Sequence, residues 1–130
     1  MVGLPVHPLH QLVGETITEA VQAVNASFER PHFEVVMDSA CSRTAAPSKQ
    51  TVPLFSSKEK SKATEYCDVD LLVLSPEGIK VIVEVEEADI TPIQICGKFL
   101  ASALSRYFIH ERKGNAEIGM SDSVLFIQVL

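Results

Sequence analysis

The sequence predicts a single α/β domain over residues 1–130, in which a mixed sheet with a central hairpin is flanked by two helices. The predicted elements follow the order helix, strand, strand, strand, helix, strand. Two runs of alternating apolar residues in the middle of the chain predict the hairpin. A length of 130 residues with 46% apolar side chains is sufficient for one hydrophobic core.

The first helix is expected over residues 7–30, because apolar residues recur there at helical spacing and Pro31 ends the pattern. His10 lies on the apolar stripe, so we expect a hydrogen-bonded core side chain there rather than a metal ligand. Residues 33–38 then predict a short strand, with Phe33, Val35 and Met37 on one face.

Residues 40–62 are small, polar and interrupted by prolines, which predicts a mobile loop. Val52, Leu54 and Phe55 could fix its middle to the core. The segment is basic, and its cations are Arg43, Lys49, Lys58, Lys60 and Lys62. Because the whole chain carries a net charge of −6, this loop is where we expect contact with a nucleic acid. The alternative is a surface loop that only aids solubility.

The hairpin is expected within residues 66–89, with Pro76, Glu77 and Gly78 as its three-residue loop. The pairing that follows puts Leu72 opposite Ile82. It also puts Asp70 opposite Glu84, and Asp68 opposite Glu86. Since side chains alternate across a strand, the four carboxylates should share one open face. The other face is wholly apolar and comprises Val69, Leu71, Val73, Val81, Val83 and Val85.

Such a cluster of acids requires compensation, because like charges opposite each other destabilise a strand pair. A shared proton, a neighbouring cation or a divalent metal with oxygen ligands would provide it. The alternative is a solvated polar face at the edge of a sheet.

The second helix is expected over residues 91–110, with Thr91 as its N-cap, Pro92 in its first position and Gln94 closing a capping box. The side chains that it should bury are Cys96, Phe99, Leu100, Ala103, Leu104 and Tyr107. The apolar run 123–130 predicts a buried strand, and the connection from the hairpin is long enough for a parallel crossover.

The hairpin acids resemble the signature of the PD-(D/E)XK nuclease superfamily, which has the restriction-endonuclease-like fold. Asp70 matches the acid that opens the second strand, and Glu84 matches the acid of the third strand. Glu86 stands where a lysine is usual, and Asp68 is a rival for the first acid. The resemblance implies an αβββαβ core.

The resemblance also implies a Mg²⁺-dependent or Mn²⁺-dependent endonuclease that hydrolyses DNA. Its catalytic residues would be Asp70, Glu84 and Glu86, and its metal ligands Asp70 and Glu84, assisted by Asp68 or the carbonyl of Val85. Some restriction endonucleases have glutamate in the third position. Lys98 could supply a cation from the following helix, although its place opposite the buried stripe also fits solvent exposure. A homodimer is expected because cutting two strands requires two sites.

Two other functions remain open. The first is a catalytically silent nuclease-like domain that serves as a binding or assembly module, which fits the net negative charge and the missing lysine. The second is a coincidence of fold without a nucleic-acid role. Glycine-rich nucleotide motifs do not occur, which argues against a nucleotide cofactor. Three scattered cysteines favour a reducing cytoplasm, and no apolar run reaches membrane-spanning length.

Overall fold

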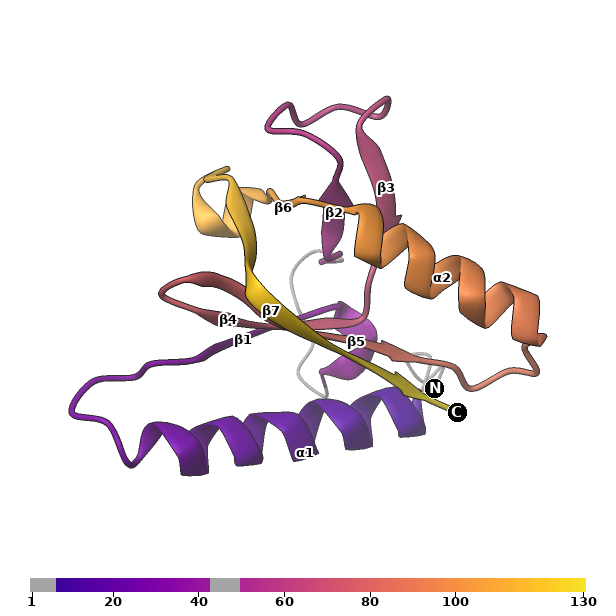
Figure 1. Cartoon of the computed structure of the whole chain (residues 1–130). Coiled ribbons are helices and arrows are strands. Elements are labelled where there is room, and N and C mark those ends of the chain that lie inside the picture. The colour runs from indigo at the N-terminus through magenta and orange to yellow at the C-terminus, as the bar shows by residue number, and fades with distance from the viewer. Residues whose placement is uncertain (1–6, 43–49) are drawn as a thin grey trace, which may run out of the picture.

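The computed structural model describes residues 7–42 and 50–130 (Figure 1). In these ranges it contains two α-helices, α1 (Pro8–Asn25) and α2 (Pro92–Leu104), and two short 3-10 helices, η1 (Ser39–Cys41) and η2 (Glu111–Lys113). The strands are β1 (Glu34–Met37), β2 (Pro53–Phe55), β3 (Glu65–Asp68), β4 (Leu71–Ser75), β5 (Gly78–Val85), β6 (Tyr107–Phe108) and β7 (Ile118–Val129). Neither described α-helix combines the length and the apolar character needed to span a bilayer.

All seven strands join one mixed sheet in the order β1-β4-β5-β7-β6-β2-β3. Only β5 and β7 pair in parallel, and the other neighbours are antiparallel. The start of β7 pairs with β6, whereas the rest of β7 pairs with β5. This long strand therefore connects two parts of the sheet (Figure 1). The α/β class with a mixed sheet and two helices is confirmed.

The hairpin of β4 and β5 has the predicted pairing of Leu72 with Ile82, but its turn is tighter than predicted. Ser75 pairs with Gly78, and an irregularity after Val73 restores the expected register. Gly78 has a φ of +127°, and a Cβ there would lie 2.3 Å from the carbonyl oxygen of Gly119 in β7. The close approach of β7 therefore requires glycine at this position.

One core lies between α1 and the outer part of the sheet. Leu71, Val73, Val83 and Val85 pack there with the apolar stripe of α1, as the sequence predicts. Helix α1 ends at Asn25 rather than at residue 30. The Asn25 side chain accepts hydrogen bonds from the backbone N–H groups of His32 and Phe33 and donates one to the Phe33 carbonyl, which turns the chain toward β1.

A second core covers the opposite face of the hairpin, so the prediction of an open face there is wrong. Leu72, Leu74, Ile79 and Ile82 pack with a group from β2, β6 and the adjoining chain, which comprises Val52, Leu54, Val69 and Phe108. Val69 therefore belongs to this core and not to the core at α1. The sheet bends so that its β6-β2-β3 part supplies the cover.

The prediction of one continuous loop over residues 40–62 is wrong at residues 53–55, which form β2. Val52 and Leu54 are fully buried, as expected of side chains that fix the middle of this segment. Arg112 holds the chain before β2, because its guanidinium donates to Met37, Gln50 and Thr51. Three apolar residues suffice for a core strand when its partners come from elsewhere in the chain.

Helix α2 begins as predicted, with the side chains and backbones of Thr91 and Gln94 forming a capping box. It ends at Leu104, before the predicted boundary, and the following chain forms β6. The predicted buried stripe is wrong, because Cys96, Phe99, Leu100, Ala103 and Leu104 are exposed and Tyr107 is half-buried. The buried side chains at this end are those of Ser102, Ser105, Phe108 and Ile109.

Candidate active site at the end of the central hairpin

Asp70 occupies the bend between β3 and β4, where the chain passes from one part of the sheet to the other. Its carbonyl accepts a hydrogen bond of 2.8 Å from the backbone N–H of Asp38 and one of 3.6 Å from the thiol of Cys41. Burial raises the pKa of that thiol to about 12, so Cys41 stays protonated. These contacts fix the backbone of Asp70.

The Asp70 carboxylate is held as firmly as its backbone. Its Oδ2 accepts a hydrogen bond of 2.7 Å from the backbone N–H of Val85, and its Oδ1 lies 3.5 Å from Nε2 of His10. Burial raises the pKa of Asp70, although the Val85 N–H and His10 partly offset the effect. The side chain is therefore oriented toward the end of β5.

Glu84 lies on β5 and is only 4% exposed. Burial, together with the neighbouring charge of Asp70, raises the pKa of Glu84 to about 7. Its Oε1 is buried and has no hydrogen-bond partner among the described residues. A buried carboxylate oxygen without a partner is unusual, because such groups are nearly always satisfied. It marks Glu84 as a candidate ligand for a cation.

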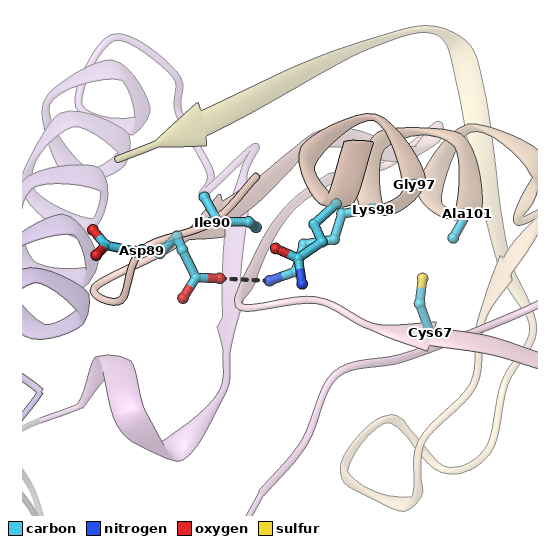
Figure 2. Close-up of a pocket in the computed structure, with 8 residues that line it drawn as sticks. Cys67, Asp89, Ile90, Gly97, Lys98 and Ala101 are labelled. Atoms are coloured by element: carbon cyan, nitrogen blue, oxygen red, sulfur yellow. Dashed lines mark hydrogen bonds and ion pairs between the residues drawn. The ribbon is translucent and has the colours of Figure 1, made fainter. Parts of the chain in front are cut away.

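Lys98 reaches this pair of acids from α2. Its Nζ lies 2.9 Å from Oε2 of Glu86 and 3.6 Å from Oε2 of Glu84, and the dashed line in Figure 2 marks the shorter contact. Burial alone would lower the pKa of Lys98, but the hydrogen bond with Glu86 and the charge of Glu84 raise it overall. Lys98 therefore remains a cation beside the acids.

Glu86 does not lie opposite Asp68, as the sequence predicts, but forms an ion pair with Lys98. It accepts hydrogen bonds from Lys98 at 2.9 Å and from the backbone N–H of Ala88 at 3.3 Å. The hydrogen bond with Lys98 lowers the pKa of Glu86, so this carboxylate is ionised at neutral pH. Its partner is a cation rather than Asp68.

Asp68 does not face Glu86, because the bend at residues 69–70 makes β3 and β4 two separate strands. Asp68 pairs with Pro53 of β2 and is exposed. Its carboxylate interacts with Glu65, which helps burial to raise the pKa of Glu65. The structure thus brings Asp70, Glu84 and Glu86 together near Lys98, but gives Asp68 a different strand partner.

The structure adds His10 and Glu87, which the sequence did not single out as site residues. Nδ1 of His10 lies 3.0 Å from Oε1 of Glu87, and the same oxygen accepts a 2.8 Å hydrogen bond from the His10 backbone N–H. The start of α1 is therefore attached to the end of β5. The spacing of His7 and His10 by three residues at a helix start is the sequence signal that could have indicated this.

A surface hollow of about 480 Å³ lies between the end of β5, β3 and α2, and of the three predicted catalytic acids only Glu86 lines it (Figure 2). Its lining includes Glu86, Lys98, Asp89, Gln94 and Cys67. Both members of the Glu86–Lys98 ion pair therefore line a cavity that a ligand can enter.

The predicted basic residues lie elsewhere. Lys58, Lys60 and Lys62 are exposed in the turn between β2 and β3, and Nζ of Lys60 donates to Asn115 at 2.9 Å. This turn precedes β3, whereas Asp70 follows it, so the seven residues 63–69 separate Lys62 from Asp70 along the chain. Arg43 and Lys49 lie outside the described residues.

Comparisons with protein-family models, curated proteins and solved structures found no match. The chemistry must therefore be inferred from the arrangement of side chains.

The half-buried carboxylate of Asp70 beside the buried carboxylate of Glu84, with its unpartnered oxygen, suits a hard divalent cation such as Mg²⁺. A lysine within 3.6 Å of Glu84 can neutralise charge that develops next to that cation. The group has the elements of a metal-assisted hydrolytic site.

Proposed function

We propose that the protein is a divalent-metal-dependent endonuclease that hydrolyses the phosphodiester bonds of DNA. The observation that carries the proposal is the buried, unpartnered Oε1 of Glu84 beside Asp70 and Lys98. The order α1, β1, β4, β5, α2, β7 also supports the resemblance to the restriction-endonuclease-like core, with β2, β3 and β6 as additions.

Asp70 and Glu84 would hold Mg²⁺ or Mn²⁺, since both offer carboxylate oxygens at the same end of the hairpin. A bound ion of this kind supplies charge neutralisation at a phosphate and a water molecule of lowered pKa. The Val85 N–H fixes the orientation of the Asp70 carboxylate by a hydrogen bond of 2.7 Å to Oδ2, whereas Oδ1 lies 3.5 Å from Nε2 of His10.

Glu86 stands where the resembled family usually has a lysine, and Lys98 supplies the positive charge of that lysine from α2. Its ammonium is positioned to stabilise negative charge on a phosphate entering the hollow. Glu86 acts as a positioning residue in this proposal, because its ion pair of 2.9 Å directs Lys98 toward Glu84.

DNA is the proposed partner, and the basic turn with Lys58, Lys60 and Lys62 is the proposed contact for its backbone. In this proposal the DNA strand runs along β3, which leads from the turn to the bend at Asp70, and so contacts both. A homodimer would supply the second site that a double-strand break requires.

The test is incubation of supercoiled plasmid with the protein and Mg²⁺ or Mn²⁺. Asp70→Asn and Glu84→Gln should each abolish cleavage. Glu77→Gln is the matched control, because Glu77 is an exposed carboxylate at the other end of the same hairpin. Unchanged metal-dependent cleavage by both site variants would refute the assignment.

The alternative is a catalytically silent nuclease-like domain that binds nucleic acid or protein. The ion pair between Lys98 and Glu86 favours it, because each charge already has a partner. In that case wild-type protein binds DNA without cutting it, even with Mn²⁺, and Glu86→Lys creates no activity.

A further inference from the structure

A second cluster of metal-ligand side chains lies where α1 begins. His7, His10 and Glu87 each offer one ligand atom, and these atoms all lie within 4.8 Å of one another. His10 is half-buried, whereas Glu87 is exposed. The two histidines are three residues apart at the start of the helix, which puts their rings on one face. The ring centroids are 5.5 Å apart.

His7 has no part in capping the helix. It occupies the N-cap position of α1, where Ser, Thr, Asp or Asn is usually preferred, yet its side chain makes no capping hydrogen bond. Its ring is instead packed edge-on against His10. The imidazole of His7 is therefore oriented by its position before the helix and directed toward His10.

His10 has a carboxylate beside each of its two ring nitrogens. Its Nδ1 lies 3.0 Å from Glu87 in the cluster, and its Nε2 lies 3.5 Å from Oδ1 of Asp70. A metal-bound histidine usually donates its other ring N–H to a carboxylate, which fixes the tautomer and the ring orientation. Asp70 is in place to accept that N–H.

We propose that His7, His10 and Glu87 form a second metal site, specific for a transition metal such as Zn²⁺. Two imidazoles and one carboxylate suit Zn²⁺, whereas Mg²⁺ requires oxygen ligands. Ligand atoms around tetrahedral Zn²⁺ are roughly 3.4 Å apart. His10 Nδ1 and Glu87 Oε1, 3.0 Å apart, already fit this spacing, so only the distances to the His7 ring, at most 4.8 Å, must shorten, by up to about 1.4 Å. Rotation of the His7 side chain at the start of α1 supplies such a movement. The fourth ligand position is open to water.

This site is separate from the pair Asp70 and Glu84 and does not depend on nuclease activity. Bound Zn²⁺ would attach the start of α1 to the end of β5. Its connection to the other site is the contact between His10 and Asp70, through which occupation of one site orients a carboxylate of the other.

The experiment is Co²⁺ titration followed by visible absorption, with competition by Zn²⁺, on protein without a histidine tag. A Cys96→Ser background removes the exposed thiol as a ligand. We expect one bound ion, with affinity reduced at least 100-fold in His7→Ala and in His10→Gln. Glu87→Gln should cost a smaller factor, because water can replace the carboxylate. His32→Ala is the matched control, since His32 lies beyond the far end of α1.

Two further variants separate this site from the carboxylate pair. Glu84→Gln should leave Co²⁺ affinity within about threefold, whereas Asp70→Ala should reduce it about 10–100-fold, because it removes the carboxylate beside Nε2 of His10. Circular dichroism confirms that each variant is folded. Unchanged Co²⁺ binding in folded His7→Ala and His10→Gln would overturn the proposal, as would binding that disappears only in Glu84→Gln.

Discussion

Nζ of Lys98 lies 2.9 Å from the carboxylate of Glu86, although the two residues belong to different elements, α2 and the chain directly after β5. The same nitrogen is 3.6 Å from Glu84. One lysine thus compensates two of the acids that share the end of the hairpin. A neighbouring cation is among the possible remedies for like-charge repulsion, and Lys98 supplies it here.

The first prediction concerns the position of that cation. Lys98→Met should reduce the single-turnover cleavage rate by roughly 10²–10³-fold, because the variant has no charge there to stabilise the transition state. The fold should survive, since the Lys98 side chain is 40% exposed. Adding Glu86→Lys to Lys98→Met should restore part of the rate. Lys80→Met is the control, since Lys80 contacts Ser123 toward the turn of the hairpin. Equal rates for Lys98→Met and wild type would exclude Lys98 from catalysis.

A second prediction is that metal-free protein loses stability as the pH rises from about 4.5 to 7. The pKa of Glu84 is about 7 in the folded protein against an ordinary value of 4.5, so within this window the folded state binds more protons than the unfolded state. The decrease should not exceed roughly 3 kcal/mol. The raised pKa of Asp70 acts in the same direction. The pKa values of Glu86 and Glu87 are lowered, so these carboxylates stabilise the fold at every pH above about 4.5, and their contribution is lost only at lower pH.

Urea unfolding at several pH values, with a chelator present, measures this slope. Glu84→Gln should flatten the slope and be the more stable protein at pH 8, because it removes a buried charge. Glu77→Gln should keep the wild-type slope. If Glu84→Gln retains the full dependence, the buried carboxylate is not its source.

A third prediction uses two helical glycines that differ in their surroundings. Gly14→Ala should lower the free energy of unfolding by about 1–3 kcal/mol or more, since a Cβ there would lie 2.3 Å from the backbone oxygen of Cys41. Gly97→Ala should raise it by up to about 1 kcal/mol, because a Cβ in α2 would meet nothing within 4 Å. Urea unfolding of both variants is the measurement. A tolerated Gly14→Ala would mean that α1 does not pack closely on η1.

The fourth prediction tests the proposed DNA interface. Changing Lys58, Lys60 and Lys62 to Ala should weaken binding to any DNA sequence. It should also reduce the slope of log K against log salt by about 0.9 for each phosphate that the protein no longer neutralises. Lys113→Ala is the control, because Lys113 is paired with Glu34 at 2.7 Å. A salt slope that stays the same in the triple variant would remove the turn from the proposed interface.

The sequence was sufficient to predict those elements that depend on residues close together in the chain. The capping box at Thr91 depends on four residues, and the register of Leu72 with Ile82 is set within one hairpin, although an irregularity after Val73 compensates for a turn tighter than predicted. The closeness of the candidate site residues Asp70 and Glu84 could be predicted for the same reason. Their relation is set within one hairpin.

The features that the sequence did not indicate depend on pairing between strands that are far apart in the chain. Strands β2, β3 and β6 have three, four and two residues, which is too short for a periodic pattern. Pairing with distant strands determines where β2, β3 and β6 form. The same distant pairing determines the bend at residues 69–70, which separates Asp68 from Glu86. The burial of Glu84 is not visible in the hairpin sequence either, because its strand also pairs with β7. Periodicity also identified an apolar stripe on α2, but it could not show that Leu100 and Leu104 stay exposed.

The parallel pairing of β5 with β7 has a consequence for the order of folding. Glu84 pairs with Gln128, and the backbone N–H of Glu86 donates to Val129 at 2.9 Å, so each acid is fixed by a residue more than 40 positions further along the chain. The hairpin can form early from local contacts, whereas closing this long connection is slow. The acids would then remain hydrated until the last strand pairs. The raised pKa of Glu84 would appear only in that final step, which makes its protonation a kinetic marker for the arrival of β7.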